Sequence, residues 1–138
     1  MLSVIIITKN EASHIGLCLE SVSWVDEIIV LDSGSQDDTV SICRKYTDKV
    51  YETDWPGFGV QKQRALDKAT GDWVLSIDAD EIVTAELRAE IEQALQQNKI
   101  HGYEIPRLSS YCGRQMRHGG WWPDYVLRLF RRSAGHFS

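Results

Sequence analysis

The sequence lacks any apolar run close to the roughly 20 residues that a membrane-spanning helix needs. Its first residues lead directly into an apolar segment without a preceding basic stretch, so we expect no signal peptide. Only three cysteines are present, an odd number without metal-ligand spacing, and Cys18 and Cys43 fall on apolar helix faces. This pattern favours buried thiols in a reducing compartment. We therefore expect a cytoplasmic protein.

The motifs of several nucleotide-binding classes are also missing. There is no P-loop pattern and no Gly-x-Gly-x-x-Gly fingerprint, which argues against a classical NAD enzyme. Basic residues are too sparse to indicate nucleic-acid binding. The charge is nevertheless uneven, with a net charge of −9 over residues 1–100 and +4 over residues 101–138. Either the C-terminal part handles an anionic partner, or it is a solvated surface of mixed charge.

Short β-branched segments alternate with segments whose apolar residues recur at helical spacing. We expect strands at 4–7, 27–31, 49–53, 73–77, 103–108 and 125–131, and helices over 15–22, around 40–43, over 60–69 and after Thr84. Gly71 is expected to close the third helix in a left-handed conformation. The alternation predicts an α/β fold of one domain, with a mostly parallel sheet and helices on both faces.

Polar residues follow three of the expected strands. Thr8, Asp32 and Asp78 each come directly after a strand's last apolar residue. Ligands of open α/β sheets bind outside the carboxyl ends of the strands. We therefore expect these three residues to gather at one edge, although they are far apart in the sequence.

The sharpest feature is the acidic segment Asp78-Ala79-Asp80-Glu81. Three carboxylates in four positions repel one another unless a cation or partner neutralises them. Oxygen ligands suit Mg²⁺ or Mn²⁺, and such an ion offsets the charge that builds up on a departing diphosphate. The alternative is a solvated acidic turn that caps the next helix.

The segments after the first two strands are candidates for nucleoside binding. Asp32 can accept a hydrogen bond from the N3–H of uracil, while Ser33 and Gly34 let the backbone approach the base and ribose. The alternative is an Asx-type turn followed by a helix cap. Polar side chains after the first strand could contact the base and ribose in the same way, or Asn10 or Ser13 could cap the following helix. This group comprises Thr8, Asn10 and Glu11.

The remaining candidates are cations and aromatic residues. Lys62 and Arg64 lie on the helix before the acidic segment and could reach a diphosphate, the alternative being a solvated helix face. Trp121 and Trp122, followed by Tyr125, could stack on sugar rings or belong to the core. Asp124 lies between them and is either a general base or a turn residue after Pro123.

Taken together, these segments resemble the inverting family 2 glycosyltransferases of the GT-A fold. The matching stretches are residues 3–11, 29–39, 61–66 and 69–81. Residues 122–130 look like the branch that acts on lipopolysaccharide core, of the β-1,4-glucosyltransferase type. The resemblance implies a nucleotide-sugar (donor) region over 1–100 and a partial acceptor-side region of the same domain over 101–138.

The resemblance also implies roles for single residues. Asp32 would bind uracil, Thr8 the base, Glu11 the ribose, Lys62 the diphosphate, Asp78 the ribose or donor sugar, and Asp80 the metal. The implied reaction is an inverting transfer of a hexose, glucose from UDP-glucose, onto a saccharide or glycolipid acceptor such as lipopolysaccharide core.

Two departures from the family pattern keep alternatives open. The chain has Lys62-Gln63 where the family usually has an Arg-Asn pair. The family's general base commonly lies beyond the aromatic segment, and in the lipopolysaccharide-core branch a Val-His-Glu-like stretch is expected shortly after Ser138. A donor-binding fragment without its base is therefore one alternative. The other is a nucleotidyltransferase, although the Gly-rich loop usual after its first strand is absent.

Overall fold

The computed structural model describes residues 1–97, 102–103, 112–114 and 129–132. The strands are β1 (Leu2–Thr8), β2 (Glu27–Asp32), β3 (Val50–Glu52), β4 (Trp73–Asp78), β5 (Glu81–Val83), β6 (Gly102–Tyr103), β7 (Cys112–Arg114) and β8 (Leu129–Arg131). The helices are α1 (Ile15–Ser21), α2 (Thr39–Cys43), α3 (Phe58–Lys68) and α4 (Ala85–Gln97). None of the helices in these ranges is long and apolar enough to cross a membrane.

The main sheet has the strand order β3-β2-β1-β4-β8-β6, and β5 pairs with β7 in a second, two-stranded sheet. β1 pairs in parallel with both β2 and β4, and β2 pairs in parallel with β3. β8 runs antiparallel to β4 and β6. The central strands are continuous apolar runs because both faces of the sheet are covered. The predicted α/β fold with a mostly parallel sheet is confirmed.

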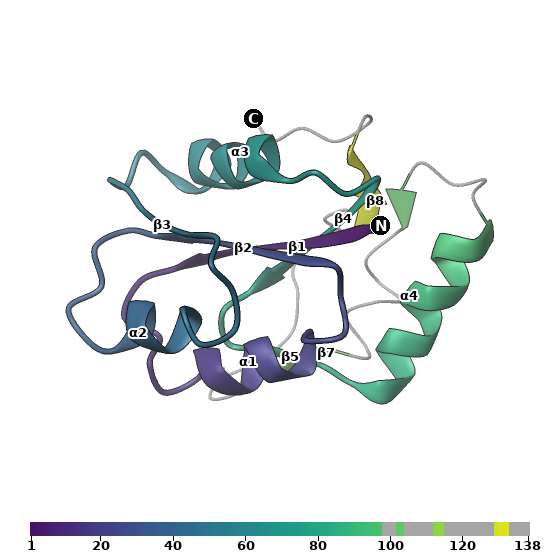
Figure 1. Cartoon of the computed structure of the whole chain (residues 1–138), viewed down its shortest axis with the longest axis horizontal. Coiled ribbons are helices and arrows are strands. Elements are labelled where there is room, and N and C mark those ends of the chain that lie inside the picture. The colour runs from purple at the N-terminus through teal and green to yellow at the C-terminus, as the bar shows by residue number, and fades with distance from the viewer. Residues whose placement is uncertain (98–101, 104–111, 115–128, 133–138) are drawn as a thin grey trace.

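Helices cover both faces of the main sheet (Figure 1). One core cluster joins the sheet to α1, α2 and α4, and a second joins the other face to Ala65 and Leu66 of α3. Cys18 and Cys43 are thiols without a disulfide and lie fully buried in the first cluster, as expected. Burial raises the pKa of the Cys43 thiol to about 12, so this thiol stays protonated and unreactive.

The long helix α4 begins as its sequence predicts. The Thr84 hydroxyl oxygen accepts a hydrogen bond from the Leu87 backbone N–H at 3.2 Å, which satisfies a donor that the first turn leaves unpaired. Leu87 and Ile91 are buried one turn apart, and Leu95 packs on the same cluster. The stripe holds α4 against the sheet and the segment after β4.

The prediction for Gly71 is wrong. Helix α3 ends at Lys68, and Ala69 leaves it in an extended conformation with φ −71° and ψ 140°. Gly71 does not have a positive φ. Glycine is needed there because a Cβ would lie 2.7 Å from Ser3 Oγ, 2.8 Å from the Met1 carbonyl oxygen and 2.9 Å from the Ser3 nitrogen. The residue permits a close approach between two segments far apart in the chain.

Helix α3 also begins earlier than predicted. It starts at Phe58 rather than at Val60, because Gly57 takes φ 113° and turns the chain into the helix. Strand β3 is confined to Val50–Glu52, shorter than the predicted 49–53.

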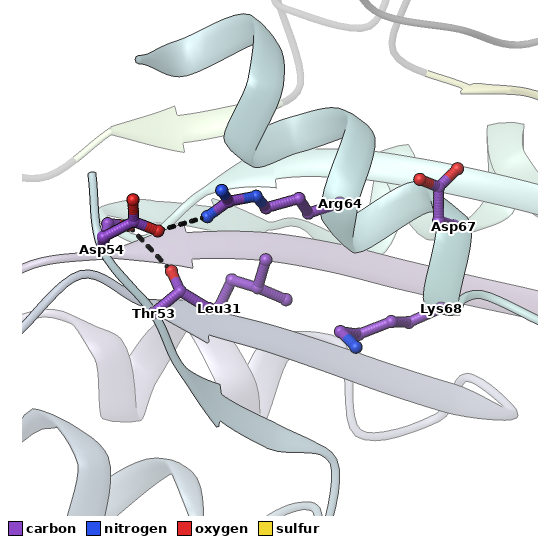
Figure 2. Close-up of a pocket in the computed structure, with 6 residues that line it drawn as sticks. All are labelled: Leu31, Thr53, Asp54, Arg64, Asp67 and Lys68. Atoms are coloured by element: carbon purple, nitrogen blue, oxygen red, sulfur yellow. Dashed lines mark hydrogen bonds and ion pairs between the residues drawn. The ribbon is translucent and has the colours of Figure 1, made fainter. Parts of the chain in front are cut away.

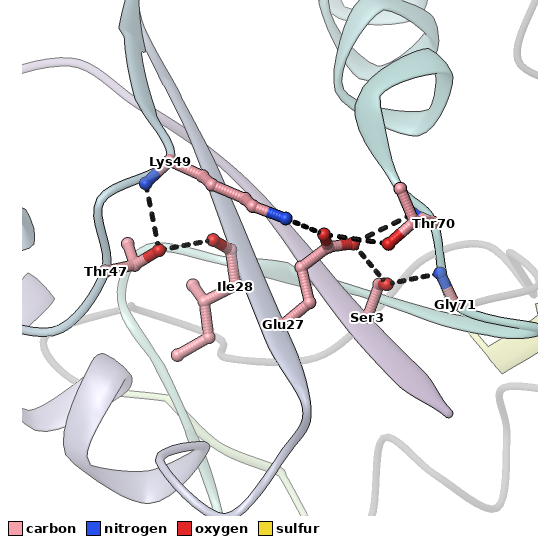
Figure 3. A network of polar contacts seen from close by, with 7 residues as sticks. All are labelled: Ser3, Glu27, Ile28, Thr47, Lys49, Thr70 and Gly71. Atoms are coloured by element: carbon pink, nitrogen blue, oxygen red, sulfur yellow. Dashed lines mark hydrogen bonds and ion pairs between the residues drawn. The ribbon is translucent and has the colours of Figure 1, made fainter.

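A buried carboxylate fastens the amino ends of the strands (Figure 3). Glu27 accepts hydrogen bonds from Ser3 Oγ at 2.6 Å, from the Thr70 backbone N–H at 2.9 Å and from Thr70 Oγ1 at 3.0 Å. Lys49 adds an ion pair. Ser3 Oγ in turn accepts from the Gly71 N–H at 2.9 Å. The network therefore joins β1, β2 and the α3–β4 connection at the amino ends of the strands, opposite their carboxyl ends, which are called the strand tips below.

Candidate functional site

The carboxyl ends of β1, β2 and β4 meet at one edge of the sheet. Thr8 is the register partner of Asp32, and Ile7 is the partner of Asp78. The Thr8 hydroxyl donates a hydrogen bond to Asp32 Oδ1 at 2.8 Å. The predicted gathering of Thr8, Asp32 and Asp78 is confirmed, and it follows from the parallel pairing of three neighbouring strands.

The Asp32 carboxylate is fully buried and holds the turn that follows β2. Oδ1 accepts hydrogen bonds from Thr8 Oγ1 at 2.8 Å and Ser35 Oγ at 2.5 Å. Oδ2 accepts from the Gly34 N–H at 3.1 Å and the Ser35 N–H at 2.8 Å. An ionised carboxylate offers about four lone-pair sites, so the chain itself uses all of them. The Asx-type turn is therefore present, and a contact with uracil N3–H, which stays a prediction, requires one of these donors to move.

Reciprocal hydrogen bonds tie the loop after β1 to the loop after β2. Asn10 has a left-handed φ of 53°. Its backbone N–H donates to Ser35 Oγ at 2.7 Å, and its Oδ1 accepts from the Gln36 N–H at 2.8 Å. The alternative that Asn10 caps α1 is wrong, since that helix begins after His14 without a side-chain cap. Asn10 instead fixes the relative position of two strand-tip loops.

Glu11 lies in the same pair of loops. Its backbone N–H donates to Thr39 Oγ1 at 2.9 Å, and its Oε1 lies 3.2 Å from His14 Nδ1. The side chain is only partly exposed. The backbone contact anchors Glu11 beside the start of α2, and its predicted contact with the ribose stays a prediction.

The acidic segment is a tight, largely buried turn between β4 and β5. Asp78 is half-buried, Asp80 is 2% exposed and Glu81 is fully buried. Glu81 Oε1 accepts a hydrogen bond from the Asp78 N–H at 2.7 Å, which closes the turn on itself. The alternative of a solvated turn that caps the next helix is wrong, because two of its carboxylates are buried and Thr84 caps that helix.

The donor set of this turn fits a hard divalent cation. No group of three or more His, Cys, Asp or Glu side chains that could hold a metal ion occurs in the described part of the chain. Mg²⁺ is typically held by one or two carboxylates together with water and substrate phosphate oxygens. Glu81 is engaged with the turn backbone, so Asp78 and Asp80 are the residues that could contribute ligands.

A cavity of about 500 Å³ opens on the α3 side of this edge (Figure 2). It is lined by Leu31, Thr53, Asp54, Arg64, Asp67 and Lys68. The Thr53 backbone N–H donates to the Asp32 carbonyl oxygen at 2.7 Å, so the cavity adjoins the tip of β2. Arg64 Nη1 lies 2.6 Å from Asp54 Oδ1, and this guanidinium lowers the pKa of the Asp54 carboxyl. Arg64, one of two predicted phosphate cations, is thus engaged in an ion pair.

Sequence reasoning assigned no role to Gln61, which the structure places at the centre of this region. The residue is fully buried on α3, and its Nε2 donates to Ser33 Oγ at 3.0 Å and to Thr53 Oγ1 at 2.5 Å. One signal was available, because Gln61 lies four residues before buried Ala65 and therefore on the apolar face of the helix. Lys62, the next residue, is half-buried.

The predicted acceptor-side residues Trp121, Trp122, Asp124 and Tyr125 lie outside the described residues. Their stacking and general-base roles stay predictions. The structure therefore describes the residues predicted to bind the nucleotide sugar, but not those predicted to bind the acceptor.

The comparisons with known proteins agree with this geometry. The model of the family described as Glycosyl transferase family 2 matches residues 3–133. An uncharacterised glycosyltransferase of Rickettsia typhi is 42% identical over 99% of this chain and 48% of its own length. The lipopolysaccharide core biosynthesis glycosyltransferase LpsC of Rhizobium meliloti is 34% identical over 99% of this chain and 53% of its own length. The chain thus spans about half the length of these curated relatives.

Solved structures resemble the fold as well. Glucosyl-3-phosphoglycerate synthase from Mycobacterium tuberculosis, in complex with Mg²⁺ and UDP, has a TM-score of 0.61 and 30% identity, covering 72% of this chain and 40% of that one. S. aureus TarS 1–349, in complex with UDP-GlcNAc, has a TM-score of 0.58 and 28% identity, covering 70% of this chain and 31% of that one. The described sheet, the strand-tip site and these matches establish part of a GT-A domain, and the chain belongs to glycosyltransferase family 2.

Proposed function

We propose that this chain binds a UDP-sugar, with UDP-glucose as the donor, at the edge where β1, β2 and β4 end. The observation that carries the proposal is the gathering of Thr8, Asp32 and Asp78 at that edge. Structures similar to this one were solved with UDP and Mg²⁺ and with UDP-glucose and Mn²⁺. In the proposed arrangement, Thr8, Asn10 and Glu11 and the Asp32-Ser33-Gly34 turn surround the nucleoside.

The diphosphate would lie beside the turn after β4. Asp80 would ligate Mg²⁺ or Mn²⁺, with Asp78 directed at the ribose or donor sugar. When bound, the cation offsets the negative charge that develops on the departing diphosphate. Lys62 would add a second positive charge to the diphosphate from α3. This donor set supports a metal held jointly by the chain and its substrate.

The proposed reaction is an inverting hexosyl transfer to a saccharide or glycolipid acceptor such as lipopolysaccharide core. A carboxylate base, Asp124 or a residue beyond Ser138, would remove the acceptor proton, and the acceptor oxygen would attack the anomeric carbon opposite the diphosphate. The likeness to LpsC supports a lipopolysaccharide acceptor. The net charge of +4 over residues 101–138 suits an anionic acceptor at the cytoplasmic face of the inner membrane.

Calorimetric titration of UDP in the presence of Mn²⁺ tests the donor site. We expect saturable binding by the unaltered chain and at least about tenfold weaker binding by Asp80→Ala, because a charge-assisted metal contact is lost. In the absence of a divalent cation the two proteins should bind UDP with similar, low affinity. Glu86→Ala, which removes an exposed carboxylate from α4, serves as the control and should bind like the unaltered chain.

Equal UDP binding by the unaltered chain and Asp80→Ala in Mn²⁺ would remove the metal role from Asp80. Absence of UDP binding by the folded chain would remove the donor site itself. Thermal unfolding of each variant distinguishes a lost ligand from a lost fold, since Asp80 is buried in a tight turn.

A second candidate is donor binding without turnover by these 138 residues. The observation that favours it is that the chain spans about half of each curated relative. Release of UDP from UDP-glucose, with a lipopolysaccharide core acceptor present, decides between the two. Turnover by this chain eliminates the second candidate, while turnover only in a longer chain supports it.

A further inference from the structure

A buried amide, that of Gln61, joins α3 to the residues that follow β2 and β3. Gln61 Oε1 faces the guanidinium of Arg64, with Nη1 at 3.4 Å, and a guanidinium can only donate hydrogen bonds. The amide oxygen therefore points to Arg64, and Nε2 points to the hydroxyls of Ser33 and Thr53. Because an amide NH₂ can only donate, both hydroxyl oxygens act as acceptors toward Gln61.

The two hydroxyls differ in whether their own hydrogen has a hydrogen-bond acceptor. Thr53 Oγ1 donates to the Asp54 carbonyl oxygen at 2.9 Å, as Figure 2 shows. Ser33 Oγ has no acceptor of this kind among the residues that the structure describes. With its acceptor side held by Gln61, the Ser33 hydroxyl has a hydrogen to donate to a group from outside the chain.

Ser33 itself is only 7% exposed, and open space lies beside the residue that follows it. Gly34, the next residue, has φ 85°, and a Cβ built on it would meet no heavy atom within 4 Å. The neighbouring Asp32 carboxylate already accepts four hydrogen bonds from the chain itself. Of Asp32 and Ser33, Ser33 is thus the residue whose side chain has a hydrogen that no described residue accepts.

We propose that Gln61 is a positioning residue that fixes the Ser33 hydroxyl as a hydrogen-bond donor to an oxygen of the donor's uridine. The acceptor is a uracil carbonyl, which can only accept a hydrogen bond, or a ribose oxygen, which can accept one. The inference rests on the proposed UDP-sugar site. It adds the direction of one hydrogen bond, from Ser33 to the uridine, and it assigns control of that hydrogen bond to Gln61, which does not touch the ligand.

A double-mutant cycle on UDP binding tests this inference. Ser33→Ala removes the donor, and we expect UDP in Mn²⁺ to bind roughly fivefold to tenfold more weakly, the effect of one hydrogen bond. Gln61→Glu replaces the donating NH₂ by an accepting oxygen, so the Ser33 hydrogen turns to Glu and the same loss is expected. Arg64 lies close enough to pair with the new carboxylate. The double variant should bind UDP within about twofold of either single variant, because the two substitutions remove the same contact between Ser33 and UDP.

Gln96→Glu, an equal change of charge at an exposed site of α4, is the matched control and should bind UDP like the unaltered chain. If the losses of Ser33→Ala and Gln61→Glu multiply in the double variant, Gln61 acts through the fold at large and the inference is overturned. Should Gln61→Glu fail to fold, Ser33→Ala decides alone, and unchanged UDP affinity overturns the inference. If the unaltered chain binds no UDP, the proposed function fails first and this inference with it.

Repeating the Ser33→Ala comparison with 2′-deoxy-UDP assigns the acceptor. A penalty that disappears with the deoxy nucleotide identifies the ribose 2′-oxygen, and a penalty that persists identifies another oxygen of the uridine, such as a uracil carbonyl. Either result supports a contact between the Ser33 hydroxyl and an oxygen of the uridine.

Discussion

At the scale of single residues, adding one methyl group at two different glycines is expected to change stability in opposite directions. A Cβ at Gly71 would lie 2.7–2.9 Å from backbone and side-chain atoms of Met1 and Ser3, where the paired strand β1 leaves little room to shift. We expect Gly71→Ala to lower the free energy of unfolding by about 1–3 kcal/mol, the usual cost of overpacking. Urea denaturation followed by circular dichroism measures this value.

Gly16 provides the control for that substitution. Its Cβ would meet only Ile42 Cγ2 at 3.8 Å, an ordinary contact, and it lies within α1. Alanine is preferred over glycine in a helix by roughly 0.5–1 kcal/mol, so Gly16→Ala should leave the protein equally or more stable. A Gly71→Ala variant as stable as Gly16→Ala would contradict the close approach between residue 71 and β1.

Local sequence patterns predict some of these features and miss others. The strands and helices follow from local patterns, such as the β-branched run before Thr8 and the stripe of Leu87, Ile91 and Leu95. The gathering of Thr8, Asp32 and Asp78 follows from the rule for parallel sheets. The saturated carboxylate of Asp32 and the close approach at Gly71 depend on partners set by register, which local patterns do not contain.

At the scale of elements, α4 is the helix whose start can be tested directly. Thr84 supplies its only described side-chain cap, a hydrogen bond to the Leu87 N–H. Thr84→Ala should lower the free energy of unfolding by about 1 kcal/mol, because the first turn loses a partner for its N–H. Thr84→Ser keeps the hydroxyl oxygen and should retain most of that stability.

Amide hydrogen exchange locates the effect of the cap. Protection should fall mainly in the first turn of α4 in Thr84→Ala, while β1 and β2 keep theirs. Equal destabilisation by serine and alanine would show that the methyl group, rather than the capping oxygen, stabilises this helix.

At the scale of the whole molecule, the candidate site and the main stabilising polar network lie at opposite ends of the sheet. The strand tips carry the candidate donor site, and the amino ends are fastened by Glu27 (Figure 3). Burial raises the pKa of the Glu27 carboxyl, but hydrogen bonds from Lys49, Ser3 and Thr70 outweigh this effect and lower the pKa from 4.5 to about 2. Folding therefore favours the ionised carboxylate, so this network stabilises the fold in a pH-dependent way at the end of the sheet opposite the candidate donor site.

The sign of the pH effect follows from that lowered pKa. Well above pH 4.5 Glu27 is ionised in both states and its full contribution, on the order of 3 kcal/mol, is present. As the pH falls toward 2, the unfolded chain binds a proton that the folded chain resists, and the contribution is lost. In urea titrations between pH 6 and pH 3, the unaltered chain should lose stability more steeply than Glu27→Gln, which has no such proton to bind.

Glu52→Gln is the matched control. The Glu52 carboxylate forms an exposed ion pair with Arg44 at 3.4 Å, so its removal should barely change the slope. Parallel pH slopes for Glu27→Gln and the unaltered chain would contradict the fastening role of the Glu27 carboxylate. At pH 7 the folded fraction of Glu27→Gln should still bind UDP as the unaltered chain does, since Glu27 pairs in register with Ser3, five positions before the Thr8–Asp32 pair. A loss of both stability and UDP affinity in this variant would show instead that the two ends of the sheet are coupled through the strands that join them.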